Sequence, residues 1–119
     1  MYLCSLASVQ MSWSYPSSLA NLVGYKDAAL ESAVNLAKIA VLGGAKAVVC
    51  SPLEVSAIRN AIPKEILLIT PGVRPIGSDS GDQARVMTPS LAVQSGADYL
   101  VIGRPITEAD DPGKAAAAI

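Results

Sequence analysis

The sequence predicts an α/β fold in which short strands alternate with helices and pair side by side in a parallel sheet. Short apolar runs rich in β-branched residues recur along the chain, and segments with helical periodicity separate them. Residues 44–52 and 96–105 also resemble each other, because each passes from a helix end through a strand to a turn. This alternation of strands and helices is typical of right-handed βα units. With 119 residues, the chain is expected to form one domain.

The first clear unit is a helix predicted over residues 27–42, where apolar side chains recur at helical spacing and Gly43 and Gly44 follow. A weak strand is expected before it at 8–11. The next strand is predicted at 47–50, and its short β-branched run is typical of a strand buried on both faces.

A helix is expected from Ser51 to about Ile62. Ser51 and Glu54 have the spacing of a capping box, in which the hydroxyl accepts from the Glu54 amide and the carboxylate reaches back. Helix capping therefore explains Ser51 better than a role as nucleophile. Residues 66–70 repeat the pattern of a buried strand.

A long Gly-rich loop is predicted from residue 71 to about 85, and a helix opens at Thr88-Pro89 and closes at Gly96. A third clear strand follows at 98–102, and Asp111-Pro112 begins a last helix rich in alanine. Since a complete (β/α)8 barrel takes about 250 residues, three or four βα units amount to half of one.

Composition excludes several classes of function. Lys plus Arg number 9 and Asp plus Glu 10, which is too balanced for nucleic acid or an anionic membrane. The absence of histidine removes Ser-His-Asp catalysis and His-based metal sites. Polar residues interrupt the uncharged first 25 residues, so no membrane span or signal peptide is expected. Two cysteines without metal or disulfide-scaffold spacing fit a cytoplasmic protein.

Candidate binding residues follow the last two predicted strands, because parallel α/β folds bind ligands beyond the carboxyl ends of strands. Gly103 allows close backbone approach, and the planar fork of Arg104 suits phosphate oxygens. Two alternatives stay open: Gly103 serves only a tight turn, or Arg104 pairs with Asp82 or Asp110. Asp79 with Asp82 is better explained as a solvated loop than as paired catalytic carboxylates.

Three stretches resemble the C-terminal half of bacterial orotidine 5′-monophosphate decarboxylase. They are PGVRP at 71–75, GSDSGDQARVMTP at 77–89 and GADYLVIGRPIT at 96–107, and VVCSPLE at 48–54 fits the sixth strand of that family. The likeness covers about 24–119 of the single domain 1–119, whereas 1–23 form a divergent N-terminal segment.

This resemblance implies strands five to eight of a TIM barrel and a family reaction that converts orotidine monophosphate into uridine monophosphate and carbon dioxide without a cofactor or metal. It implies substrate binding, chiefly through the phosphate, by Arg74, Gln83, Gly103 and Arg104. Ser12 is the candidate for the substrate-contacting hydroxyl at the end of strand five, although the surrounding residues depart from the family pattern.

The catalytic residues of the family are missing. Its proton donor is a lysine in an Asp-x-Lys-x-x-Asp run, and none of the five lysines here has such flanking carboxylates. We therefore expect no catalytic residue in the chain and no activity from the chain alone. The alternatives are a non-catalytic half barrel that binds phosphate or a nucleotide, and a different phosphate-binding barrel enzyme. Open edges and an open apolar face predict a homo-oligomer or a complementing N-terminal half.

Overall fold

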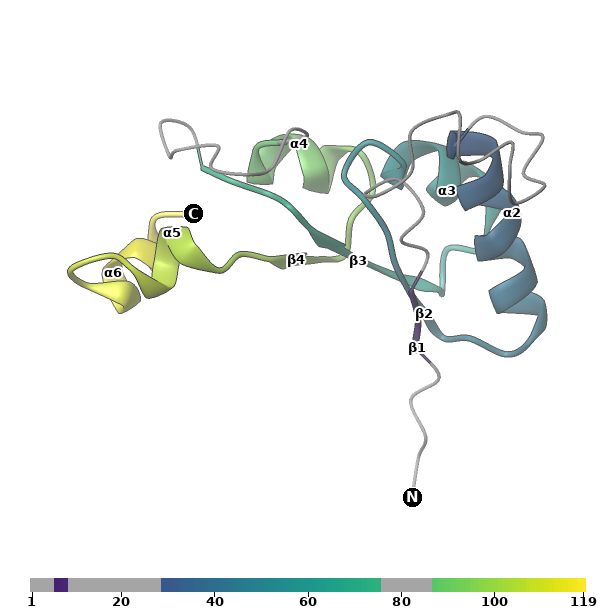
Figure 1. Ribbon diagram of the computed structural model, residues 1–119, viewed down its shortest axis with the longest axis horizontal. Coiled ribbons are helices and arrows are strands. Elements are labelled where there is room, and N and C mark those ends of the chain that lie inside the picture. The colour runs from purple at the N-terminus through teal and green to yellow at the C-terminus, as the bar shows by residue number, and fades with distance from the viewer. Residues whose placement is uncertain (1–5, 9–28, 76–86) are drawn as a thin grey trace, which may run out of the picture.

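The computed structural model describes residues 6–8, 29–75 and 87–119. These residues contain one parallel sheet with the strand order β1-β2-β3-β4 (Figure 1). Its strands are β1 (Leu6–Ser8), β2 (Ala47–Val49), β3 (Leu67–Pro71) and β4 (Tyr99–Val101). Neighbours in the sheet are also neighbours in the chain, which confirms the predicted succession of βα units.

The helices α2 (Ala29–Leu42), α3 (Val55–Ala61) and α4 (Pro89–Gln94) cover one face of this sheet (Figure 1). Two short helices, α5 (Arg104–Thr107) and α6 (Pro112–Ala117), follow β4 and contact each other. Neither contains a buried residue. The core therefore lies between the sheet and α2, α3 and α4, as expected for half of a TIM barrel.

Side chains alternate between the two faces of each strand. Val48 of β2 and Leu68 of β3 are fully buried beneath the helices, and Leu100 of β4 packs against the same core. The opposite face is the side that lines the interior in a closed barrel. There Ile69 pairs in register with Val49 on one side and with Tyr99 on the other.

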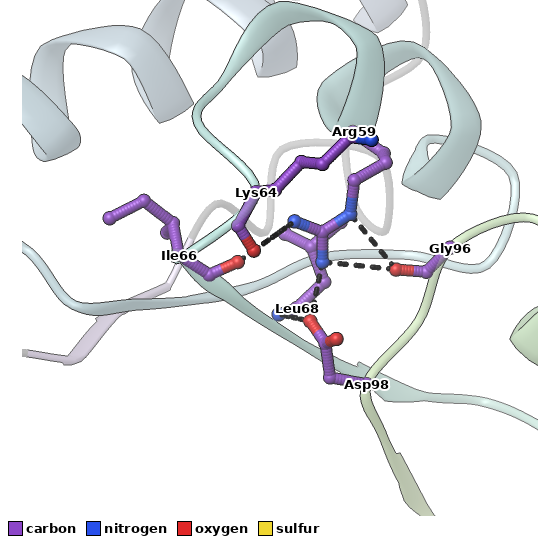
Figure 2. A network of polar contacts seen from close by, with 6 residues as sticks. All are labelled: Arg59, Lys64, Ile66, Leu68, Gly96 and Asp98. Carbon is purple, nitrogen blue, oxygen red and sulfur yellow. Dashed lines mark hydrogen bonds and ion pairs between the residues drawn. The ribbon is translucent and has the colours of Figure 1, made fainter.

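Arg59 ties the amino ends of β3 and β4 to α3 (Figure 2). Its Nε and Nη2 donate to the Gly96 carbonyl at 3.1 and 3.0 Å, and Nη1 donates to the Ile66 carbonyl at 2.9 Å. Nη2 also forms an ion pair with Asp98, whose carboxylate accepts from the Leu68 amide at 2.7 Å. One side chain thus satisfies carbonyls of two separate turns.

Gly96 is required at this position for two reasons. Its φ of +110° is a conformation that side chains with a Cβ rarely adopt, and it ends α4 as the sequence predicts. A Cβ there would lie 2.9 Å from Cγ of Arg59, which is closer than real Cβ contacts.

Two expected element boundaries are corrected. The capping box at Ser51 is wrong: Pro52 to Glu54 form a turn, the Ser51 carbonyl accepts from the Glu54 amide, and α3 begins only at Val55 without a side-chain cap. The chain turns after β2, and both Ser51 and Glu54 are buried there. The first strand includes Leu6 and Ala7, before the expected start at Ser8, and residues 9–11 of the expected strand lie outside the described residues.

Candidate functional site

The carboxyl ends of β3 and β4 border a pocket of about 200 Å³. Both strands run in the same direction and pair from Ile69–Tyr99 to Pro71–Val101, so the segments that follow them leave the sheet side by side. The pocket is lined by Gly72, Val73, Arg74, Val101, Gly103, Arg104 and Pro105.

The β3 side of the pocket is held by backbone contacts across the long loop. The Arg74 amide donates to the Met87 carbonyl at 3.0 Å, and Val73 forms a bridge with Met87. Val73 is 2% exposed and Arg74 only 8%. The stem of Arg74 is therefore fixed by packing, which limits the rotamer freedom that binding has to restrict.

The β4 side begins with Gly103, the N-cap of α5. Its carbonyl accepts from the Ile106 and Thr107 amides at 2.8 and 3.1 Å. Apart from its chain neighbours, no described residue has an atom within 4 Å of a Cβ added at Gly103, so close packing against them does not account for the glycine. The adjacent Arg104 is exposed and lines the same pocket.

This arrangement favours an anion. Among the residues that the structure describes, two arginines line the pocket and no carboxylate does. A guanidinium is always charged and offers parallel N–H donors that match phosphate or carboxylate oxygens in pairs. Glycines at positions 72 and 103 leave backbone surface uncovered beside the two arginines.

Three of the five sequence-predicted binding residues, Arg74, Gly103 and Arg104, therefore lie together at this pocket. Gln83 and Ser12 lie outside the described residues, as do Asp79 and Asp82. The sequence analysis did not single out Gly72, Val73, Val101 and Pro105 as lining residues. Their positions directly at the ends of two predicted strands could have indicated them.

No catalytic group is evident at the pocket in the part of the chain that the structure describes. Lys38, Lys46, Lys64 and Lys114 are exposed and none of them lines the pocket. The described residues also contain no cluster of three His, Cys, Asp or Glu side chains that could hold a metal ion. None of the described helices is long and apolar enough to cross a membrane.

Cys50 follows β2 but is not poised to act as a nucleophile. Burial raises the pKa of its thiol from 9.0 to about 11, and the charge of Glu54 adds to this, while the nearby Thr70 hydroxyl and the charge of Arg59 oppose it. The side chain is fully buried. A thiol with this pKa stays protonated at neutral pH and reacts slowly.

The fold and the pocket together define the class of protein as half of a (β/α)8 barrel with an arginine-lined pocket at the strand carboxyl ends. A family model described as "Orotidine 5′-phosphate decarboxylase / HUMPS family" matches residues 4–119. The chain belongs to this family.

The individual relatives that match this chain carry the name of the same family. A curated orotidine 5′-phosphate decarboxylase of Thermobifida fusca is 49% identical over 96% of this chain and 49% of its own length. One from Haemophilus influenzae is 52% identical over 77% of this chain and 40% of its own. The crystal structure of the Lactobacillus acidophilus enzyme superposes with a TM-score of 0.77 at 35% identity, over 95% of this chain and 46% of that one. The chain thus spans about half the length of the relatives it matches.

Proposed function

We propose that this chain is the C-terminal portion of an orotidine 5′-phosphate decarboxylase and holds the substrate phosphate. The enzyme converts orotidine monophosphate into uridine monophosphate and carbon dioxide in pyrimidine biosynthesis. The proposal is supported most by one observation: Arg74, Gly103 and Arg104 line a single pocket at the strand carboxyl ends of a chain that belongs to this family.

In this proposal the pocket binds the phosphate, and Gln83 and Ser12 add further contacts to the nucleotide. The phosphate does not react, yet its binding energy helps to position the reacting part of the substrate. The proposed domain is a single partial barrel of residues 1–119, in which 24–119 carry the phosphate-binding half and 1–23 diverge. The reacting centre comes from a complementing N-terminal half.

A second candidate function is a non-catalytic module that binds a phosphorylated ligand. It is favoured by the absence of an Asp-x-Lys-x-x-Asp run from all 119 residues. In that case the pocket would hold a nucleotide without chemistry. A cytoplasmic location remains a prediction from the cysteine usage for both candidates.

Calorimetric or NMR titration with uridine monophosphate, inorganic phosphate and uridine tests whether the pocket binds phosphate. We expect the first two ligands to bind with Kd near the millimolar range, equivalent to about −4 kcal/mol. Uridine should not bind detectably, since it lacks the group that the arginines recognise. Equal binding of uridine and uridine monophosphate would contradict a phosphate site.

Arg104→Ala should weaken binding about tenfold to a hundredfold, because a charge-assisted bidentate contact contributes roughly 1.5 to 3 kcal/mol. Arg104→Lys should recover only part of the affinity, since an ammonium lacks the planar fork. Lys46→Ala is the matched control, because it removes an exposed cation just before β2, at the opposite end of the sheet. If Arg104→Ala and Lys46→Ala bind equally, Arg104 is not a phosphate ligand.

A further inference from the structure

The arginine-lined pocket depends on how two neighbouring strands are placed relative to each other. It takes Arg74 from the segment after β3 and Arg104 from the segment after β4. The two strands pair in parallel, with Thr70 beside Leu100. A slip of β4 by one residue would move Arg104 by about 3.3 Å relative to Arg74 and would turn the side chains of the strand to the other face. A correct register is therefore a condition for both arginines to reach one anion.

Hydrogen bonds at the amino ends of the same strands define this register. The Asp98 amide donates to the Leu68 carbonyl at 2.9 Å, and the Asp98 carboxylate accepts from the Leu68 amide at 2.7 Å. Asp98 thus bonds both backbone polar groups of Leu68, one through its main chain and one through its side chain. A slip of one residue would break the side-chain bond.

Arg59 holds Asp98 and the starts of both strands in this arrangement (Figure 2). Nη2 of Arg59 pairs with the Asp98 carboxylate and donates to the Gly96 carbonyl, and Nη1 donates to the Ile66 carbonyl. Gly96 precedes β4 and Ile66 precedes β3. Because the N–H groups of a guanidinium form a rigid fork, the two turns are held at a fixed relative position.

These contacts lie apart from the pocket. Neither Arg59 nor Asp98 lines it. Asp98 precedes the lining residue Val101 by three positions, which is about 10 Å along a strand. An effect of Arg59 or Asp98 on ligand binding must therefore pass through the paired strands.

We propose that Arg59 and Asp98 are positioning residues for the phosphate site. They set the register of β4 against β3 and thereby the relative position of Arg74 and Arg104. The inference rests on the proposed function, because it concerns the affinity of the same pocket for phosphate. It adds to that function a dependence of affinity on contacts at the opposite end of the strands.

Phosphate titration followed by NMR tests this role in variants that circular dichroism shows to be folded. Arg59→Lys keeps the charge but loses the fork, and it should weaken binding of inorganic phosphate about three- to tenfold. Ile58→Val is the matched control, because it shortens a fully buried side chain next to Arg59 and removes none of these hydrogen bonds. It should leave the affinity within about twofold of the parent.

A double-mutant cycle shows whether Arg59 acts through the placement of the two arginines. Arg104→Lys replaces the planar fork with a flexible ammonium, which tolerates a displaced strand better. Arg59→Lys should therefore weaken phosphate binding by less than about twofold in the Arg104→Lys background. Equal losses in both backgrounds would overturn the positioning role, because a merely structural effect is independent of the residue at 104.

Asp98→Asn is the second variant, and it takes the place of Arg59→Lys in the cycle if that variant does not fold. It removes the charge of the ion pair while keeping the shape of the side chain. A smaller loss of about two- to fourfold is expected. Unchanged phosphate binding by the folded variant would overturn the proposal.

Hydrogen exchange in the parent protein needs no variant. Because coupling between two sites is reciprocal, phosphate should slow exchange of the Leu68 and Asp98 amides. At ten times the Kd the slowing should reach about tenfold. The Gly43 amide, which bonds the Ile39 carbonyl at the end of α2, should respond less because it opens locally. Equal slowing at all three amides would indicate only global stabilisation and would overturn the proposal.

Failure of the proposed function gives a different result. If the parent binds no phosphate, or if Arg104→Ala binds it as the parent does, the pocket is not a phosphate site and the positioning role is overturned with it. If the parent binds phosphate through Arg104 and Arg59→Lys binds it equally well, the phosphate site stands and only the positioning role is overturned.

Discussion

Arg59 illustrates how one side chain can hold turns that lie far apart in the sequence. Its side chain is 16% exposed, and its guanidinium donates to the Gly96 and Ile66 carbonyls and pairs with Asp98. Arg59→Met keeps much of the apolar stem but leaves these groups without their donor. Since hydrogen bonds to charged groups contribute about 1.5 to 3 kcal/mol, we expect a loss of roughly 2 to 3 kcal/mol in unfolding free energy.

Urea denaturation at fixed protein concentration measures this loss, because association would otherwise shift the apparent stability. Arg59→Lys should recover little, since a single ammonium cannot span both carbonyls. Lys38→Met removes an exposed cation from α2 and should change stability by less than about 0.5 kcal/mol. Similar stability of the two methionine variants would show that the Arg59 contacts do not stabilise the fold.

Cys50 gives a pH dependence with a definite sign. Burial raises the pKa of its thiol from 9.0 to about 11 in the folded protein, so the folded state retains the proton at pH values where the unfolded chain loses it. The contribution is fully present below pH 9 and is lost as pH rises toward 11. The loss approaches about 3 kcal/mol over that window.

Urea titrations at several pH values, compared between the parent and Cys50→Ala, isolate this effect because the lysines and tyrosines titrate in both proteins. We expect the parent to lose more stability than Cys50→Ala between pH 9 and pH 11. Parallel pH profiles would contradict a buried thiol with a raised pKa.

Individual pocket-lining residues could be predicted where the local sequence indicates the end of a strand. Arg104 follows Gly103 directly after an apolar run, and the structure places both at the pocket. Arg59 could not be found in the same way, because its partners Gly96 and Asp98 are 37 and 39 residues away. Contacts between residues so far apart in the sequence depend on how the helices pack on the sheet. Local sequence patterns do not determine this packing.

Among the helices, α4 has the N-cap that the sequence predicts at Thr88. The Thr88 hydroxyl accepts from the Leu91 amide at 3.4 Å, and Pro89 stands at the start of the helix. Because this hydrogen bond is long, Thr88→Ala should cost only about 0.5 to 1 kcal/mol, near the low end for N-caps.

Thermal or urea unfolding tests the cap. Thr88→Ser keeps the hydroxyl and should retain most of the stability. Ser90→Ala changes an exposed residue in the first turn of α4 and serves as the control. A Thr88→Ala variant that matches the Ser90→Ala control would mean that the cap contributes nothing.

Other elements were harder to predict. The helix after β2 starts four residues later than its first capping signal, because burial of Ser51 and Glu54 prevails over the local capping preference. The short helix α5 is not among the helices that the sequence predicts, since four residues after a glycine give too little periodicity to recognise. In contrast, Gly43 and Gly44 correctly marked the end of α2, where Gly44 has a φ of +93°.

At the scale of the whole molecule, the two ends of the sheet have different roles. The Arg59 contacts tie β3 and β4 together at their amino ends, and the arginine-lined pocket lies at their carboxyl ends. This division matches the general organisation of parallel barrels, in which one face stabilises and the other carries the ligand-binding loops. Fixing the amino ends also fixes the spacing of the two segments that form the pocket.

The count of βα units was sufficient to predict half of a TIM barrel, because each strand carries its own local signal. The sequence of strands such as 47–49 is apolar throughout and indicates burial on both faces. It therefore could not predict which face of the sheet is exposed to solvent. The strands thus have the composition of a barrel interior, and the chain spans about half the length of the barrel proteins it matches.

The sequence also bears on whether the chain can catalyse the family reaction by itself. We predict no measurable decarboxylation of orotidine monophosphate by the isolated chain, because no Asp-x-Lys-x-x-Asp run is present to supply a proton donor among fixed charges. The assay follows uridine monophosphate formation by chain purified from a host that lacks its own decarboxylase.

The same assay is then repeated with a separately produced N-terminal half of a relative. Activity that requires both proteins, and that falls when Arg104→Ala replaces the parent chain, would support the proposed decarboxylase portion. Turnover by the isolated chain would contradict the prediction. Nucleotide binding without turnover in any mixture would favour the non-catalytic module, because the pocket would then hold phosphate in a protein that never meets a reacting centre.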